Sequence, residues 1–290
     1  MATTAKKQEQ AAEGFDHHPL DDLLRTDRIP HIWCPGCGIG PTFSATLRGI
    51  KASGVDLAST VMVSGIGCSG RAAGYVKLDS YHTTHGRAIP FATGLKLANP
   101  KLNVIVFSGD GDLFAIGGNH FIHAARRNMD LTVICVNNLN YGMTGGQAAA
   151  TTPRMAKTTT TPKGNPDRPF NLPLLAYAAG ATFVARWTIL HSRDLMESVQ
   201  TALTRRGFSF IEVLAPCPIN YGRRNKELPL VTLRNYQGNT IIKNGASPAE
   251  IAPPGQGPVV LGRFIDEDQD SFLSLYDKTY RPQLAETGKD

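Results

Sequence analysis

The chain has 290 residues, of which 41% are hydrophobic and 19% charged. This composition supports a sizeable buried core and excludes a wholly disordered chain, a collagen and a disulfide-stapled miniprotein. The formal net charge is +6, but Lys and Arg are scattered and form no stripe interleaved with aromatic residues, which argues against nucleic-acid binding. A cationic surface also suits anionic cofactors, anionic substrates and an acidic electron carrier.

The first sixteen residues are polar and lack the apolar segment of a secretory signal. No stretch of the chain approaches the ~18 apolar residues that a membrane helix needs. We therefore expect a cytoplasmic protein. The five cysteines are an odd set in a large intracellular chain, which favours metal or cluster ligation over a disulfide framework.

Residues 1–31 are predicted to form an N-terminal arm that extends over a surface, because they are mostly polar. Apolar runs typical of buried strands follow at Thr60–Ser64, Leu102–Ser108, Leu131–Asn137 and Phe208–Leu214. Gly117–Asn128 has helical character, so the second and third runs form a βαβ unit with a parallel sheet and a right-handed crossover. The prediction for residues 32–222 is thus an α/β domain with a doubly wound, mainly parallel sheet.

Two segments have no clear period. Thr144–Pro169 is rich in Thr, Gly and Pro, and a loop of that length in a compact domain is usually functional. Residues 223–290 are punctuated by Pro and Gly. They are interpreted as a C-terminal extension that packs on a partner subunit, with a disordered tail as the alternative.

Polar residues follow two neighbouring predicted strands. Asp110 ends one strand, Asn138 ends the next, and Asn140 lies two residues further on. The carboxyl ends of parallel strands share one edge of the sheet, where doubly wound folds bind ligands. Gly109 and Gly111 allow close approach of an anion, and the following helix directs amide donors toward it. A carboxylate beside a diphosphate requires a cation, and the oxygen donors of Asp110, Asn138 and Asn140 suit Mg²⁺.

This arrangement resembles the thiamine diphosphate signature, in which Gly-Asp-Gly is followed about thirty residues later by Asn-Asn. The tripeptide alone is weak evidence, since turns use Asp and Gly freely; its place after a buried strand makes it specific. Asp112 remains open between a cofactor contact and a helix N-cap.

Four cysteines lie in turns rich in glycine or proline: Cys34 and Cys37 in a C-x-x-C motif, Cys68, and Cys217 between two prolines. Four thiolates satisfy either a tetrahedral Zn²⁺ or a 4Fe–4S cluster. Spacing alone does not exclude zinc, but a one-electron centre beside a thiamine site has a use that a structural zinc lacks. Cys135 lies within a predicted strand and is interpreted as a core residue.

Together these motifs resemble the β subunit of two-subunit 2-oxoacid:ferredoxin oxidoreductases, most of all those that act on 2-oxoglutarate. The resemblance covers about Trp33 to Cys217 and rests on the segments WCPGCG, SGIGCSGR, THGRAIPFATGLKLANP, SGDGD, GNHFIHAARRN, NNLNYGMTGGQ and APCP. It implies a sheet of the thiamine diphosphate-binding type, thiamine diphosphate, Mg²⁺ and one 4Fe–4S cluster on Cys34, Cys37, Cys68 and Cys217. It also implies that the cofactor contacts Ile66, Gly67, Cys68, Ser69, His85, Asp110, Gly111, Asp112, Asn138, Asn140, Gly142 and Met143.

The resemblance further implies a catalytic role for two residues. His85 follows from the motif, although a lone histidine beside a glycine is also typical of a turn. Relatives commonly have a lysine where this chain has Arg71, which keeps the charge and adds a planar fork suited to a carboxylate. An ordinary surface arginine is the alternative.

The implied reaction is oxidative decarboxylation of a 2-oxoacid with coenzyme A, giving CO₂, an acyl-CoA and electrons for ferredoxin, and it is reversible in principle. The implied partners are an α subunit, in an αβ or (αβ)₂ enzyme, and ferredoxin. Between Glu13 and Glu197 there is no glutamate, so the glutamate that activates thiamine is expected from the α subunit. A non-redox thiamine decarboxylase or synthase with a structural zinc, an oxidoreductase for pyruvate or branched 2-oxoacids, and a non-catalytic scaffold protein are the alternatives.

Overall fold

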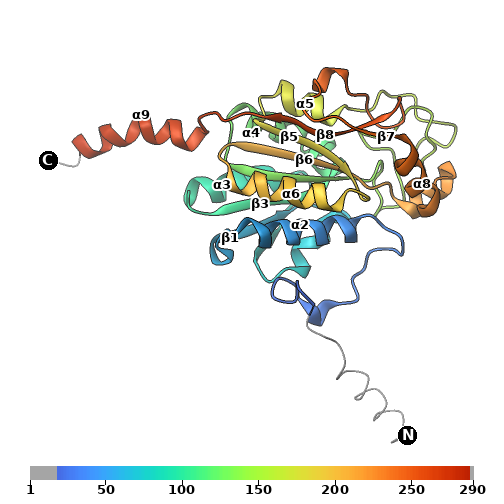
Figure 1. The fold of residues 1–290 in the computed structure, drawn as a ribbon, viewed down its shortest axis with the longest axis horizontal. Coiled ribbons are helices and arrows are strands. Elements are labelled where there is room, and N and C mark those ends of the chain that lie inside the picture. Colours follow the sequence, from blue (N-terminus) through green and yellow to red (C-terminus); the bar gives the residue numbers. More distant parts are fainter. Residues whose placement is uncertain (1–17, 288–290) are drawn as a thin grey trace, which may run out of the picture.

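The computed structural model describes residues 18–287; the first part of the predicted N-terminal arm lies outside them. Within these residues one eight-stranded sheet has the order β2-β1-β3-β4-β6-β5-β8-β7. Figure 1 shows the sheet with α2 (Ile39–Ser53) and α6 (Ser192–Thr204) in front of it. The strands are β1 (Thr60–Ser64), β2 (Asp79–His82), β3 (Asn103–Gly109), β4 (Leu131–Asn137), β5 (Phe183–Thr188), β6 (Phe208–Leu214), β7 (Thr240–Ile242) and β8 (Val259–Asp266).

The first six strands of the sheet order run parallel to one another. All four strands expected from the apolar runs are present, three with the predicted bounds unchanged to the residue and β3 shifted by one residue. The central strands β4 and β6 are buried along their whole length, as expected of strands covered on both faces. The predicted α/β fold with a mainly parallel sheet is confirmed.

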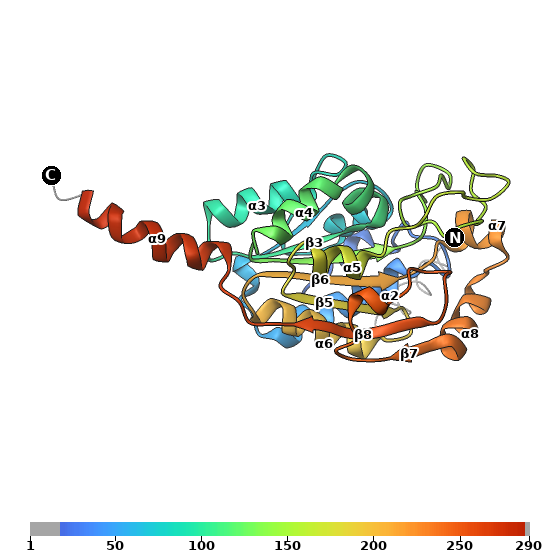
Figure 2. The same cartoon turned by 90° about the horizontal axis from the view of Figure 1, so that it is seen from above.

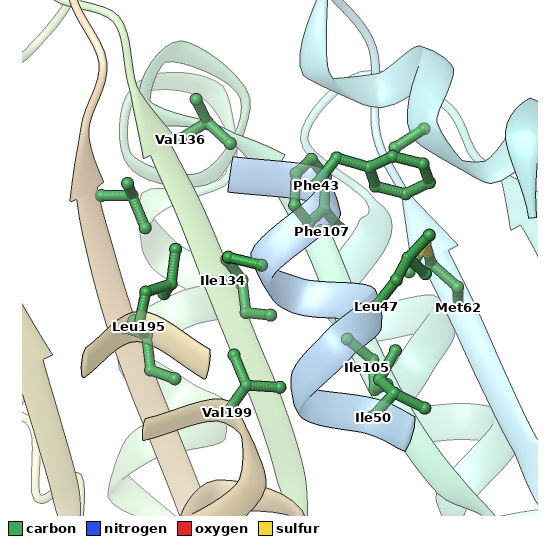
Figure 3. Close-up of a cluster of buried hydrophobic side chains, with 14 of the residues drawn as sticks. Phe43, Leu47, Ile50, Met62, Ile105, Phe107, Ile134, Val136, Leu195 and Val199 are labelled. Carbon is green, nitrogen blue, oxygen red and sulfur yellow. The ribbon is translucent and has the colours of Figure 1, made fainter. Parts of the chain in front are cut away.

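Helices cover both faces of this sheet (Figure 2). One face carries α2 and α6; the other carries α3 (Ala88–Ala98), α4 (Gly118–Arg126) and α5 (Leu172–Ala178). A hydrophobic core lies between each helical layer and the sheet. Figure 3 shows the core under α2 and α6, where Phe43, Leu47 and Ile50 of α2 and Leu195 and Val199 of α6 point toward the sheet. The two layers hold the strand ends rigidly, so the side chains that follow each strand have fixed places.

The segment after β3 becomes helical earlier than its sequence pattern indicates. A wide helical turn, η4 (Gly111–Ile116), starts directly after Asp110 and leads into α4. Asp110 is therefore the residue that begins the helical segment, and the N-cap alternative for Asp112 is wrong. Residues 144–169 contain no helix and no strand of the sheet, in agreement with the predicted long loop.

The chain beyond residue 222 contributes to the sheet, which its sequence pattern did not indicate. After η5 (Pro218–Gly222), α7 (Arg223–Asn225) and α8 (Pro229–Asn239), β7 pairs with β8, and β8 pairs antiparallel with β5. A shift of register and Gly262, with φ +144°, interrupt the alternation of β8. The last helix, α9 (Phe272–Thr287), extends away from the body (Figures 1 and 2). Packing of this region on a partner subunit stays a prediction.

Short 3₁₀ helices complete the fold: η1 (Thr26–Arg28), η2 (Leu57–Ser59), η3 (Ser69–Tyr75) and η6 (Pro248–Glu250). In the described residues no helix has both the length and the apolar character required to cross a bilayer.

Candidate active site

The ends of β3 and β4 bring Asp110 and Asn138 together at the carboxyl edge of the sheet. Gly109 and Val136 are register partners, so the two following turns begin side by side. The Asn138 backbone N–H donates to Asp110 Oδ1 at 3.4 Å. This contact joins the two halves of the diphosphate signature, which lie 28 residues apart in the chain.

The Asp110 carboxylate, the Asn138 side-chain amide and the Asn140 carbonyl oxygen converge at this point. One of the two terminal atoms of the Asn138 side-chain amide faces inward. It lies 3.1 Å from Asp110 Oδ1 and 2.5 Å from the Asn140 carbonyl oxygen. With its nitrogen inward, the Asn138 amide would donate to both atoms; with its oxygen inward, it completes a triad of hard donors. A carboxylate, an amide oxygen and a peptide carbonyl are the donor set that Mg²⁺ binds together with phosphate oxygens. The residues present therefore fit a magnesium ion.

Asp110 is almost completely buried. Burial raises the pKa of its carboxyl group to about 6, against hydrogen bonds from Thr151 and the Asn138 amide that act in the opposite direction. The Thr151 hydroxyl donates to Asp110 Oδ2. Such a carboxylate has too little local charge compensation from the protein alone, and a bound cation would supply it.

The side-chain amide of Asn140, like the Asp110 carboxylate, lacks in the described part of the chain the partners that its burial requires. Both polar atoms of its side-chain amide are buried, and neither has a hydrogen-bond partner among the described residues. Buried amides are rarely left without partners in proteins. The Asn140 amide therefore fits contact with a bound polar group.

The Asp112 carboxylate connects three segments of the chain. Its Oδ1 accepts from the Ile66 backbone N–H at 3.0 Å, the His85 Nδ1–H at 2.6 Å and the Gly86 N–H at 2.7 Å. Its Oδ2 accepts from the Ser108 hydroxyl at 2.9 Å. A Cβ atom at Gly65 would lie 1.8 Å from Asp112 Oδ2, so only glycine lets this turn approach. Asp112 orients His85 and fixes the turn that contains Ile66.

We expect Asp112→Ala to lower the free energy of unfolding by about 3 kcal/mol or more, since four donors lose their acceptor. Asp112→Asn retains one acceptor oxygen and should lose less. Thermal or urea unfolding of the two variants measures the difference. An Asp112→Ala protein as stable as the original chain would show that these hydrogen bonds do not hold the site together.

Every residue predicted to contact the cofactor lines one pocket, and Gly109, Tyr141 and Thr144 complete its lining. Ile66 and Met143 are partly exposed at this pocket. The His85 side chain is 34% exposed and lies edge-on to the Tyr141 ring, with the centroids 6.1 Å apart. Arg71 is exposed on η3 and does not line the pocket. The structure thus gathers the predicted set at one place, with Arg71 outside it.

The four cysteines proposed as ligands lie close together, since the thiols of the others help to raise the pKa values of Cys37 and Cys68. Burial is the largest cause, and the neighbouring thiols add to it, so the pKa values of Cys37 and Cys68 rise to about 11. Cys34 is exposed, whereas Cys37, Cys68 and Cys217 are half-buried. Binding of a metal or cluster would release protons from these thiols. Among residues 18–287 no group of three or more His, Cys, Asp and Glu side chains is arranged so that it could hold a metal ion.

A hydrogen bond and the closeness of Gly142 to two of the sulfurs show how the cysteine segments lie together. The Trp33 indole N–H donates to the Cys68 carbonyl oxygen at 2.8 Å, and the indole packs against Phe43 and Tyr75. A Cβ atom at Gly142 would lie 3.5 Å from Cys68 Sγ and 3.6 Å from Cys217 Sγ. These are ordinary van der Waals distances, so the Gly142 backbone lies beside the side chains of both cysteines.

Cys135 is separate from this set. It is fully buried in β4, and burial raises its pKa well above the usual value. This agrees with its interpretation as a core residue.

Comparison with known proteins identifies the family. Residues 65–213 match the family described as thiamine pyrophosphate enzyme, C-terminal TPP binding domain. The chain is 49% identical to the 2-oxoglutarate synthase subunit KorB of Methanothermobacter marburgensis, over 94% of each chain. It is 48% identical to the same subunit of Methanocaldococcus jannaschii, over 88% of this chain and 95% of that one. The chain belongs to the family of 2-oxoacid:ferredoxin oxidoreductase β subunits.

A solved structure agrees with this membership. The chain resembles the 2-oxoglutarate:ferredoxin oxidoreductase of Magnetococcus marinus with a TM-score of 0.83 and 29% identity, over 94% of this chain and 92% of that chain. The chain is therefore a subunit of a thiamine diphosphate-dependent oxidoreductase that works with an α subunit.

Sequence reasoning missed several residues that shape the site. Trp33 and Ser108 lay within the quoted motifs, so their motif position was a usable signal. Thr151 lies in the long loop, and its contact with Asp110 depends on how that loop folds back. Tyr141 lay within the quoted motif NNLNYGMTGGQ, but the contact of its ring with Gly111 also depends on the fold. No pattern of neighbouring residues predicts a contact that forms only when a loop folds back onto a distant segment.

Proposed function

We propose that the chain is the β subunit of an enzyme that oxidatively decarboxylates 2-oxoglutarate with coenzyme A to succinyl-CoA and CO₂, and passes the electrons to ferredoxin. The relatives from Methanothermobacter marburgensis and Methanocaldococcus jannaschii are named 2-oxoglutarate synthase subunits. The Magnetococcus marinus enzyme was solved with 2-oxoglutarate, coenzyme A and succinyl-CoA bound. A cytoplasmic location accords with such an electron carrier.

One observation carries the redox part of the proposal. Cys68 and Gly142 line the pocket beside Asp110 and Asn138, and Gly142 also lies against Cys68 and Cys217. The cofactor pocket and the cysteine group thus share a wall. A 4Fe–4S cluster on Cys34, Cys37, Cys68 and Cys217 would lie next to bound thiamine diphosphate, where a structural zinc would have no role in electron transfer.

The residues of the chain have distinct proposed tasks. Asp110, Asn138 and Asn140 would hold Mg²⁺ and through it the diphosphate. Thiamine diphosphate, when bound, supplies the electron sink for decarboxylation. His85, oriented by Asp112, would place a hydrogen-bonding nitrogen at the pocket, and Ile66 and Met143 would exclude water from its mouth.

The activating glutamate is proposed to come from the α subunit. Among the described residues, the only carboxylates that line the pocket are Asp110 and Asp112. Both already bind groups of this chain. Glu212, which lies on a predicted strand, is buried in β6 and pairs with Arg186. Arg71 is exposed near the turn of Cys68 and would meet a substrate carboxylate once the α subunit closes the site.

A substrate panel on the co-expressed αβ enzyme tests this function. We expect 2-oxoglutarate to give a kcat/KM at least about tenfold higher than pyruvate or a branched 2-oxoacid, because a second carboxylate adds a charge-assisted contact. Reduction of a viologen dye in the presence of coenzyme A is the measurement, and the β subunit alone should be inactive. Preference for pyruvate would reassign the substrate; decarboxylation without dye reduction would favour a non-redox enzyme.

A further inference from the structure

A buried ion pair lies in the middle of the sheet, close to the site. Arg186 on β5 and Glu212 on β6 are register partners, 1% and 0% exposed at their side chains, with Arg186 Nε 2.6 Å from Glu212 Oε2. Two residues earlier on the same face, Val184 and Phe210 are ordinary core residues. A buried pair rarely stabilises a fold more than apolar side chains of similar volume would, because both charges lose their hydration. Stability alone does not account for its presence.

The second oxygen of the Glu212 carboxylate binds a residue next to the metal turn, which is the turn after β4 that contains Asn138 and Asn140 of the proposed magnesium site. Glu212 Oε1 accepts from Asn137 Nδ2 at 2.7 Å. Asn137, the last residue of β4, is fully buried. Its own side-chain oxygen accepts from the Leu139 backbone N–H at 3.2 Å. The three side chains therefore form a chain of hydrogen bonds from β5 to the turn after β4.

The orientation of the Asn137 amide depends on this chain. An ionised carboxylate only accepts hydrogen bonds, so Glu212 requires the Asn137 nitrogen on its side and leaves the Asn137 oxygen for Leu139. Leu139 has φ +66°, a left-handed conformation that is unfavourable for a residue with a branched side chain. The hydrogen bond from its amide, and one that its carbonyl accepts from Thr152 at 2.7 Å, hold it there.

We infer that Arg186 and Glu212 are positioning residues for the metal turn, acting through Asn137. Leu139 lies between Asn138 and Asn140, so its conformation sets where the Asn138 side chain and the Asn140 carbonyl meet Asp110. Arg186 offsets the buried Glu212 charge and is held by the Ala252 carbonyl oxygen, 3.0 Å from its Nη1. The inference rests on the proposed magnesium site.

Binding measurements on the αβ enzyme stripped of thiamine diphosphate and Mg²⁺ test it. Asn137→Ala cuts the link between the pair and the turn. The double variant Arg186→Met, Glu212→Leu replaces the pair by apolar side chains of similar size. Each is expected to raise the Kd for thiamine diphosphate at fixed Mg²⁺ about tenfold, the usual effect of losing one buried hydrogen bond. Combining all three substitutions should raise the Kd little further, because they interrupt the same series of hydrogen bonds.

Thermal unfolding separates positioning from folding. The double variant should unfold near the temperature of the original enzyme while binding the cofactor more weakly. Ser198→Ala is the control: it removes the hydrogen bond from Trp187 at 2.8 Å on the other face of β5, and should lower stability without changing the Kd.

Two results would overturn the inference: an unchanged Kd in Asn137→Ala, or an unchanged Kd in a folded double variant. If the double variant does not fold, Asn137→Ala against Ser198→Ala decides. Asp110→Asn distinguishes a failure of the magnesium site from a failure of the positioning role. If it leaves binding unchanged, the magnesium site itself is wrong; if it abolishes binding while Asn137→Ala has no effect, only the positioning role fails.

Discussion

Asp110→Asn is expected to weaken the binding of thiamine diphosphate and Mg²⁺ by about a hundredfold or more and to abolish decarboxylation. The substitution keeps the shape of the side chain and removes the only negative charge in the oxygen triad. Charge-assisted contacts contribute up to about 3 kcal/mol each, which corresponds to roughly a hundredfold in Kd. Titration of the stripped αβ enzyme, followed by fluorescence or calorimetry, gives the binding constants directly.

The same variant should leave the cofactor-free protein at least as stable as before. Burial raises the pKa of Asp110 to about 6, above the ordinary value of 3.8. The folded state therefore holds this proton more tightly than the unfolded state, and ionisation lowers stability as the pH rises through about 6. Asparagine removes that effect. Asp79→Asn, at an exposed position on β2, is the control. It should change neither the binding of thiamine diphosphate nor the stability of the cofactor-free protein. Unaltered cofactor binding in Asp110→Asn would contradict the magnesium site.

Cys217→Ser is expected to remove the broad visible absorption of a 4Fe–4S cluster and to lower viologen reduction by at least about a hundredfold. A cluster requires its four thiolates, and a serine oxygen is a poor substitute for one of them. Binding of thiamine diphosphate should change little, because Cys217 does not line the cofactor pocket. Absorption and iron analysis of the purified αβ enzyme measure the first effect, and dye reduction measures the second.

Cys135→Ala provides the matched control for this prediction. Cys135 lies in the core of β4, so its loss should reduce stability modestly and leave the absorption and iron content intact. A colourless enzyme that contains zinc at the four cysteines would refute the redox centre. An unchanged spectrum in Cys217→Ser would remove Cys217 from the ligand set.

The sequence was sufficient for the parts of this protein that depend on local pattern. The continuous apolar runs of β3 and β4 identified buried parallel strands, and parallel strands necessarily end at the same edge. That geometry alone placed Asp110 beside Asn138, 28 residues away. The glycine and proline turns around the four cysteines were equally visible, since such turns are encoded by the residues within them.

The tertiary structure decided whatever depends on strand order and on long-range contacts. The order β4-β6-β5 places Glu212 between Arg186 and Asn137, and no periodicity in one strand reveals which strands flank it. The role of Asp112 likewise arises from three segments that meet only in the fold. The addition of β8 to the sheet was hidden by a bulge and a glycine. A single chain specifies its strands locally, but the neighbours of each strand follow from the packing of the whole domain.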